Sequence, residues 1–161
     1  MPTHIFYGRG KMKKLVCIIL LISLVIGLCS CDKRQDAYGM LWEFVRAYGA
    51  EGVIYSPAVP EGDDGYIGEG LIEKIYVFSG RFPENYAIFL NSHSDYGSEC
   101  GAFVCENADM ELMVMEMCLE RIRLLGRGSD IAFVKRGGGV IFYSTMRDRN
   151  RAEKIWQQII K

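Results

Sequence analysis

The sequence predicts a single α+β domain, in which an antiparallel sheet carries helices on one face. Two pairs of short apolar runs, at residues 86–90 with 99–105 and at 130–135 with 140–144, have the length of strands and polar or glycine-rich connections. Each pair is followed by a segment whose apolar residues recur at helical spacing. The order is therefore β-β-α-β-β-α, and two helices on one face of such a sheet form a two-layer arrangement.

An N-terminal helix is predicted before these strands. Its apolar positions are spaced by three and four residues, with Asp36 as N-cap and Gly49 as the stop. Residues 52–55 are either a short strand or an extended lead-in. A loop at 56–65 and a short helix within 67–76 precede the first strand pair.

The first β-β-α unit contains a buried strand at 86–90 and a second strand at 99–105. Alternation places Cys100 on one face of this second strand, and Gly101 and Cys105 on the other. Its helix begins at Asn107 or Asp109 and is rich in methionine, which favours packing against the sheet, although an adaptable binding surface is the alternative.

The second unit contains a hairpin around three consecutive glycines, residues 137–139. These glycines lie between strands and not before a helix, so they do not form a phosphate-binding loop. Asn150 and Glu153 have the spacing of a capping box at the start of the final helix.

The first thirty residues are predicted to be a lipoprotein signal peptide. Lys11, Lys13 and Lys14 precede an apolar run at 15–28, and the run ends in Leu28-Cys29-Ser30-Cys31. This motif resembles the bacterial lipobox, in which a small residue precedes the cysteine that receives the lipid. We therefore expect lipidation at Cys31. The alternatives are an uncleaved anchor helix and general secretion.

Cys29 is the less suitable acceptor, because Leu28 would then occupy the position of the small residue. Asp32 after the lipidated cysteine predicts retention at the inner membrane in bacteria with two membranes, and the outer leaflet in bacteria with one. Translation is expected to start at Met12, since residues 9–11 can be encoded by a purine-rich ribosome-binding site; a dispensable leader is the alternative. In bacteria with one membrane or with two, the domain, residues 31–161, is expected to work outside the cytoplasm.

The charge of this domain is unevenly distributed. It holds fifteen basic and all twenty acidic residues, a net charge of −5. Residues 121–161 carry +7 and residues 32–120 carry −12. The acidic balance and the predicted export argue against a general nucleic-acid binder. The basic C-terminal segment predicts either contact with polyanions or lipid headgroups, or a surface whose charges cancel within the fold.

The cysteines after Cys31 do not form a disulfide framework. Cys100 and Cys105 lie ~16 Å apart on opposite faces of one extended strand, whereas a disulfide requires Cα atoms within ~7 Å. Cys105 and Cys118 remain a possible pair, and buried free thiols are the alternative.

Few residues offer catalytic chemistry. His93, the only histidine after the signal, lies in the polar connection at 91–95 beside Ser94 and Asp95, but a triad requires residues that converge from separate elements. The acidic loop at 61–65 lacks the ligand spacing of an EF-hand. We therefore expect no metal and no cofactor.

Several segments of the chain resemble a family of small bacterial lipoproteins of unknown function with a C-terminal two-layer α+β domain. In that family a glutamate begins the second strand, an arginine lies late in the long helix and a glycine precedes a strand; Glu99, Arg121 and Gly139 match. The resemblance covers about 90 residues, at 71–76, 86–90, 99–103, 119–122, 139–144 and the terminal helix. It implies fold and location, but no reaction, and marks Glu99 and Arg121 as candidate site residues together with His93.

The function expected from the sequence is that of a membrane-anchored, non-enzymatic binding or accessory domain of the cell envelope. Its partners would be the membrane, through the lipid anchor, and an envelope protein or polymer. The first alternative is a small hydrolase or thiol-dependent enzyme using His93, Asp95, Cys100 or Cys105. The second is a polyanion or lipid-surface binder that uses the basic C-terminal segment.

Overall fold

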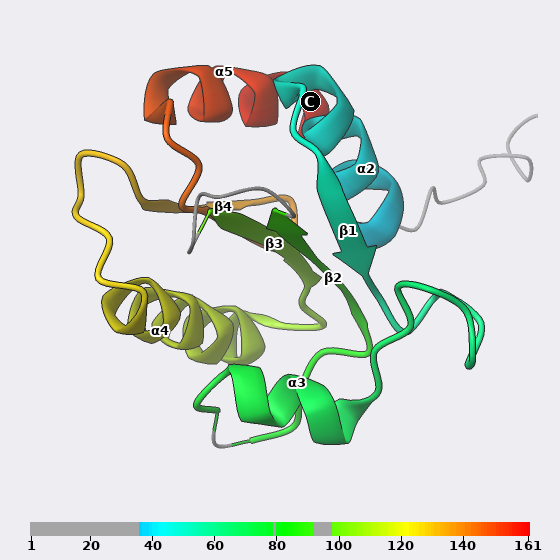
Figure 1. Ribbon diagram of the computed structural model, residues 1–161. Helices are drawn as coiled ribbons and strands as arrows, with labels where there is room; N and C mark the ends of the chain where they lie inside the picture. The colour runs from blue at the N-terminus through cyan, green and yellow to red at the C-terminus, as the bar shows by residue number, and fades with distance from the viewer. Residues whose placement is uncertain (1–35, 79, 92–97) are drawn as a thin grey trace, which may run out of the picture. The chain divides into compact units, whose positions relative to one another are not determined.

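The computed structural model describes residues 36–78, 80–91 and 98–161. The signal segment, Cys31 and His93 lie outside these residues. Gln35–Lys161 form one compact unit. Its elements are α2 (Ala37–Tyr48), β1 (Gly52–Tyr55), α3 (Glu69–Ile75), β2 (Asn85–Asn91), β3 (Glu99–Val104), α4 (Ala108–Leu124), β4 (Phe133–Gly137), β5 (Val140–Ser144) and α5 (Arg149–Ile159) (Figure 1). No helix among the described residues is long and apolar enough to cross a membrane.

The strands form one five-stranded sheet in the order β1-β2-β3-β5-β4, and every neighbouring pair is antiparallel. The predicted α+β class with an antiparallel sheet is confirmed. Residues 52–55, for which the sequence left two interpretations, pair with β2 as an edge strand. The strand predicted at 130–135 lies instead at Phe133–Gly137, closer to the glycine turn.

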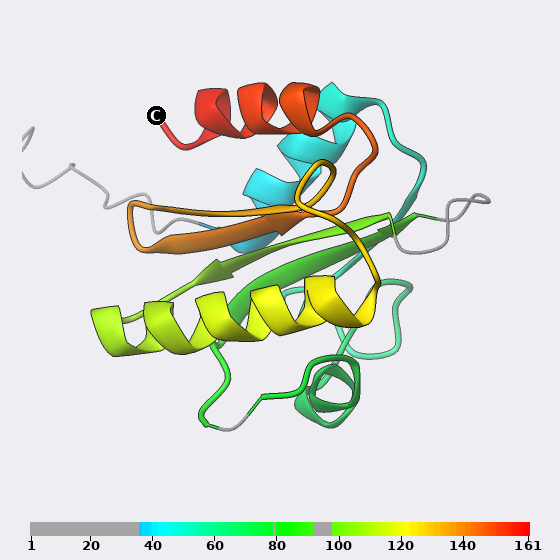
Figure 2. The ribbon, with the colours of Figure 1, turned by 90° about the vertical axis from the view of Figure 1, so that its left-hand side faces the viewer.

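Helices cover both faces of the sheet, so the prediction that they lie on one face is wrong. Figure 2 shows α2 and α5 on one side of the strands and α3 and α4 on the other. Two separate apolar clusters correspond to these sides: one joins Phe44 and Trp156 to Phe89 and Phe142, and the other contains Tyr76. The domain therefore has three layers, with the sheet in the middle.

The physical reason lies in the central strands. All five residues of β5 and five of the six residues of β3 are buried. A strand with one solvated face alternates apolar and polar residues, whereas a strand covered on both faces is apolar throughout. The runs at 86–90 and 140–144 are of the second kind, and that pattern requires a helix layer on each side.

Side-chain caps begin the three long helices. Asp36 accepts from the backbone N–H groups of Tyr38 and Gly39, and Asn107 from that of Met110. The final helix is capped by Asp148, which accepts from the N–H of Arg151, and not by Asn150 as predicted. Asp148 lies two residues before Asn150 and satisfies a free donor of the first turn of α5, while Glu153 binds Arg149 instead of closing a capping box.

The α2–α5 side of the core depends on aromatic stacking. The rings of Phe142 and Trp156 lie 4.0 Å apart and nearly parallel, and Phe44 packs on Phe142 at 4.8 Å. Each fully buried side chain of this size contributes about 1.5–3 kcal/mol. The stacking holds α5 on the sheet and leaves its polar side directed to solvent.

Candidate functional site

Four side chains form a buried polar cluster on the α3–α4 side of the sheet: Glu99, Arg121, Tyr76 and Tyr143. We refer to them as the Glu99 cluster. Arg121 Nη2 and Nε donate to the two carboxylate oxygens of Glu99 at 2.7 and 2.8 Å. The Tyr143 hydroxyl donates to Glu99 Oε1 at 2.5 Å, and the hydroxyls of Tyr76 and Tyr143 lie 2.5 Å apart. The cluster joins four parts of the chain that are distant in sequence.

Local structure brings these side chains together. Glu99 and Tyr143 lie on the neighbouring strands β3 and β5 and point to the same face, and α4 crosses that face with Arg121 in its last turn. Tyr76 follows α3, whose end is held by a bond of 3.3 Å from Arg121 to the carbonyl of Ile75. The arginine therefore connects α4 to both the sheet and α3.

The hydrogen bonds define a direction of donation. Because the Tyr143 proton points to Glu99, the oxygen of Tyr143 is free to accept, and Tyr76 is the donor of the bond between the two hydroxyls. Tyr76 thus donates to Tyr143, and Tyr143 donates to Glu99. Each hydroxyl proton in the chain has an acceptor.

Burial dominates the electrostatics of the cluster. Glu99 is only 3 % exposed, and the two tyrosines are fully buried. Burial, followed by the nearby Glu99 charge, raises the pKa of Tyr76 well above its ordinary value. Burial, Tyr76 and Glu99 raise the pKa of Tyr143 in the same direction. Hydrogen bonding to Glu99 raises the pKa of Arg121. Both phenols stay neutral. The opposite charges in the cluster are those of the ion pair between Arg121 and Glu99.

Thr145 fixes the main chain at Glu99. Its hydroxyl accepts from the N–H of Glu99 at 2.9 Å and donates to the carbonyl of Glu99 at 3.1 Å. The N–H of Thr145 also donates to that carbonyl, at 2.9 Å. The backbone and the carboxylate of Glu99 are therefore both held in place.

The cluster has the properties of a structural cross-link. A general acid or base needs an open position from which a substrate reaches it, whereas both carboxylate oxygens of Glu99 are occupied by donors of the protein. Neither of the two surface hollows described below is lined by a member of the cluster. Removing one partner of a buried ion pair is strongly destabilising, because it leaves the other charge uncompensated.

The sequence named two members of the cluster and missed two. Glu99 and Arg121, predicted from the family resemblance, contact each other directly. The sequence pattern predicts Tyr76 and Tyr143 only as apolar positions of a helix and a strand. One signal was present: Gly101 lies opposite Tyr143 in the sheet, and a Cβ at Gly101 would lie 2.6 Å from the Tyr143 ring. A glycine in a central strand indicates that another group approaches closely.

The three cysteines of the described chain are free and buried. Cys100 lies in the α2–α5 core, and Cys105 and Cys118 lie in the opposite core, as strand alternation predicts. The possible Cys105–Cys118 disulfide is not formed. Burial, then Glu111, raises the pKa of Cys105 to about 11, and burial raises the pKa of Cys100 and Cys118. Thiols of this kind are poor nucleophiles, because the thiolate is the reactive form.

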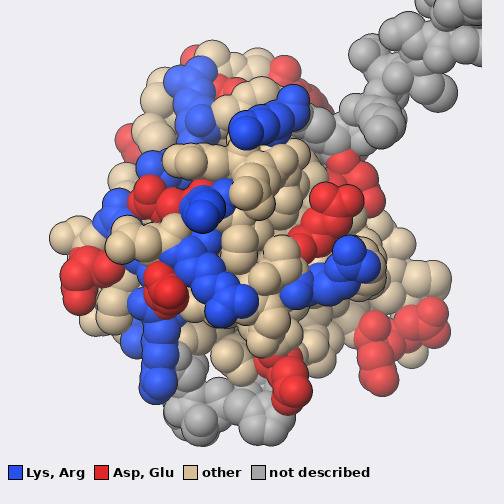
Figure 3. Space-filling model, turned by 90° about the horizontal axis from the view of Figure 1, so that it is seen from above, with Lys and Arg blue, Asp and Glu red and all other residues tan. Residues whose placement is uncertain are grey.

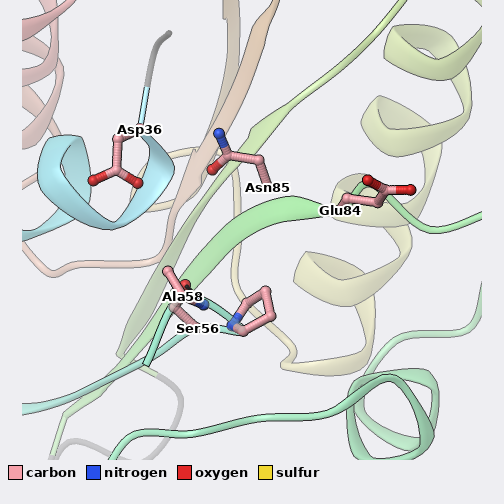
Figure 4. A pocket seen from close by; sticks show the side chains of 6 residues that line it. Asp36, Ser56, Ala58, Glu84 and Asn85 are labelled. Carbon is pink, nitrogen blue, oxygen red and sulfur yellow. Dashed lines mark hydrogen bonds between the residues drawn. The ribbon is translucent and has the colours of Figure 1, made fainter. Parts of the chain in front are cut away.

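A hollow of about 250 Å³ lies at the start of α2 (Figure 4). Its lining residues are Asp36, Ser56, Pro57, Ala58, Glu84 and Asn85. Asp36 caps α2, Ser56 donates to the carbonyl of Tyr86, and Asn85 accepts from the N–H of Ala37. The Glu84 carboxylate is directed away from Asp36 in Figure 4 and pairs with Arg81. These polar groups stabilise the local chain and do not converge on a ligand.

Most of the exposed large apolar side chains lie in the layer formed by α3 and α4. Six of the eight large apolar side chains that the described chain exposes lie on α3, on α4 or between α3 and β2. We refer to them as the α3–α4 surface: Leu71, Val77, Leu112, Met113, Leu119 and Leu124. A hollow of about 180 Å³ lies within it, lined by Val77, Phe78, Met113 and Met117, with Glu116 and Glu120 among its lining residues. Val77 and Met113 meet at this hollow, and contiguous apolar surface is typical of a protein contact site.

Much of the basic C-terminal segment is neutralised by ion pairs. Arg121 pairs with Glu99 and Arg123 with Glu120. Arg136 pairs with Glu111, and both Lys135 and Arg149 pair with Glu153. Arg151 and Lys154 of α5 and Lys161 at the C-terminus are exposed and belong to none of these ion pairs. No three His, Cys, Asp or Glu side chains of the described chain are arranged to hold a metal ion.

Comparisons with known proteins found no matching family model, no matching curated protein and no matching solved structure. The resemblance to small bacterial lipoproteins therefore depends on the sequence segments named above.

Proposed function

We propose that this chain is a lipid-anchored domain on the outer side of a bacterial cytoplasmic membrane, and that it binds an envelope protein or polymer without catalysing a reaction. The observation that carries the proposal is the motif Leu28-Cys29-Ser30-Cys31 between a basic, apolar segment and the first capped helix. A diacylated cysteine holds a protein stably to a bilayer, because two acyl chains exceed the marginal affinity of one.

Three properties of the described residues support a binding role over an enzymatic one. The Glu99 cluster has no open position, and the three thiols are buried with raised pKa values. The α3–α4 surface instead offers apolar side chains for contact. The alternative, a small envelope hydrolase or thiol-dependent enzyme, would have to use His93 and Asp95 from the connection at 92–97, outside the described residues.

The anchor is tested by labelling growing cells with an alkyne analogue of palmitate. We expect label on the wild-type chain and none on Cys31→Ala, which should also accumulate as uncleaved precursor. Cys29→Ala is the matched control, because it removes a cysteine two positions away and should keep the label. Label on Cys31→Ala, or a cleaved chain without label, would overturn the anchor.

The binding role is tested by placing a photo-crosslinking amino acid at Leu119, in the α3–α4 surface, and at Asp63, in an exposed loop. We expect one dominant envelope adduct from position 119 and none from position 63. Equal adducts from both positions, or none from either, would contradict a partner at this surface. An envelope substrate whose turnover is lost in the His93→Ala variant would favour the enzymatic alternative.

A further inference from the structure

We propose that the outer side of α2 and α5 lies against the anionic phospholipid headgroups of the membrane that holds the anchor. We refer to this side as the α2–α5 face, made of Trp42, Arg46, Arg151, Lys154 and Lys161. This inference depends on the proposed function, because it assumes the lipid at Cys31. It adds an orientation: one helix layer touches lipid, and the opposite layer points away.

The outer side of α5 is predominantly basic, and its cap Asp148 is the exposed acid beside it. The helix has one acidic residue, Glu153, which is half-buried and turned to Lys135 and Arg149. The exposed residues of α5 and of the C-terminus are Asn150, Arg151, Lys154, Gln157, Gln158 and Lys161. Such amide and cationic side chains suit a surface of phosphate groups, because anionic headgroups attract each nearby Lys or Arg.

The cations of the face have no acidic partner among the ion pairs of the described residues. Within the described chain, Arg46, Arg151, Lys154 and Lys161 form no ion pair, in contrast to Lys135, Arg136 and Arg149 just before them. Arg151 packs on the Tyr48 ring and reaches the carbonyl of Ala47, so it bridges α5 and α2. Figure 3 shows this side, with basic side chains spread across it and acidic ones between them. Glu43 is an exposed acidic residue of α2.

Trp42 gives the face an interfacial residue. Its side chain is 45 % exposed on α2, and the guanidinium carbon of Arg46 lies 4.9 Å from the centre of its ring. Tryptophan is enriched at the level of the headgroups, where its ring contacts acyl chains and its N–H remains hydrated. An exposed tryptophan beside an unpaired arginine therefore fits a membrane surface better than open water.

The chain length between the anchor and α2 limits how far the domain can move from lipid. Five peptide units join Cys31 to Asp36, which spans at most about 18 Å when fully extended. The α2–α5 face is therefore tethered within reach of the bilayer, and a weak contact suffices because it is intramolecular. The α3–α4 surface lies on the other side of the sheet (Figure 2), where it stays accessible to a partner.

The two tryptophans of the described chain allow a direct test. The full-length, lipidated chain is reconstituted into vesicles whose lipids carry bromine near the headgroup, either of phosphatidylcholine alone or with phosphatidylglycerol. Trp156 is buried, so quenching should report on Trp42. We expect at least twofold stronger quenching in the anionic vesicles, reversal by high salt, and loss of the difference in Trp42→Phe.

Charge variants on the two layers distinguish an effect of the α2–α5 face from an effect of the net charge of the chain. Arg46→Gln with Lys154→Gln should abolish the anionic enhancement, while Lys74→Gln with Arg123→Gln, on the other layer, should keep it. Equal quenching in both vesicle types, or none in vesicles that carry the chain, would overturn the orientation but not the anchor. A chain that fails to float with neutral vesicles would instead overturn the anchor. Salt-sensitive binding to an anionic wall polymer with no quenching would assign the face to polymer and overturn the lipid contact.

Discussion

Arg121 binds Glu99 through two parallel hydrogen bonds, of 2.7 and 2.8 Å, so one arginine near the end of α4 neutralises the carboxylate at the start of β3. The bidentate geometry requires the planar guanidinium, which lysine cannot replace. The pair also joins α4 to the first residue of β3. Because Arg121 also donates to the carbonyl of Ile75, loss of this ion pair is expected to destabilise the packing of both α3 and α4.

Glu99→Gln should destabilise the domain by about 3 kcal/mol, because it leaves the largely buried Arg121 without its counter-charge. The free energy of unfolding, measured by urea denaturation, checks this expectation. Glu120→Gln is the control: it breaks an exposed pair with Arg123, and such pairs contribute little. Equal effects of the two variants would show that burial of Glu99 has no energetic consequence.

Tyr143→Phe should cost more than Tyr76→Phe. Loss of the Tyr143 hydroxyl removes a donor to Glu99 and leaves the buried Tyr76 proton without an acceptor, a penalty of about 1–3 kcal/mol. Loss of the Tyr76 hydroxyl removes only one donor, at about 1 kcal/mol. The same denaturation measurement on both variants decides the order, and the reverse order would mean that Tyr143 donates to Tyr76.

Gly101→Ala should destabilise the domain by about 1–3 kcal/mol, as overpacking of a core does. The new Cβ would lie 2.6 Å from a ring carbon of Tyr143, whose hydroxyl is held by Glu99, so the ring cannot move away freely. Gly70→Ala, in α3, is the control, since no atom lies within 4 Å of its Cβ position and alanine favours a helix. Thermal unfolding of both variants tests the difference; equal melting temperatures would contradict it.

Cys105 should resist alkylation until strongly alkaline pH. Because its pKa is raised to about 11, its reaction rate should rise about tenfold per pH unit from pH 7 to 10, whereas an ordinary thiol reaches its plateau above a pKa of about 8.5. The same shift stabilises the fold below about pH 8.5, and this contribution is lost as the pH rises toward 11. Mass spectrometry after timed alkylation of the folded chain measures the profile. A plateau near pH 9 would contradict the raised value.

Local features of the fold were predictable because they depend on neighbouring residues. Asp36 and Asn107 are short polar side chains before apolar helical patterns, and both cap the helices that follow. Gly138 and Gly139 adopt positive φ in the β4–β5 turn, where a tight hairpin demands it. The cap of α5 was misplaced by two residues, because Asp148 and Asn150 are both suitable caps and only the packed helix selects between them.

The prediction of two layers is wrong because the central strands are covered on both faces and not on one. Tyr86 and Ile88 pack under α3 and α4, while Ala87 and Phe89 pack under α2 and α5. The apolar run at 86–90 requires a helix layer on each face of the sheet, but it does not indicate which helices form each layer. That choice depends on the connections between elements, which no single segment encodes.

The sequence by itself predicts an export signal with a candidate lipid site at Cys31. It determined the helices, the central strands and the separation of Cys100 from Cys105, since each follows from periodicity or spacing along a short segment. Only the tertiary structure decided that Tyr76 and Tyr143 complete the pair of Glu99 and Arg121, and which basic residues remain unpaired on the α2–α5 face. Both are contacts between distant segments. They exist only after the chain has packed, because burial and proximity, and not residue type, select the partner of each charge.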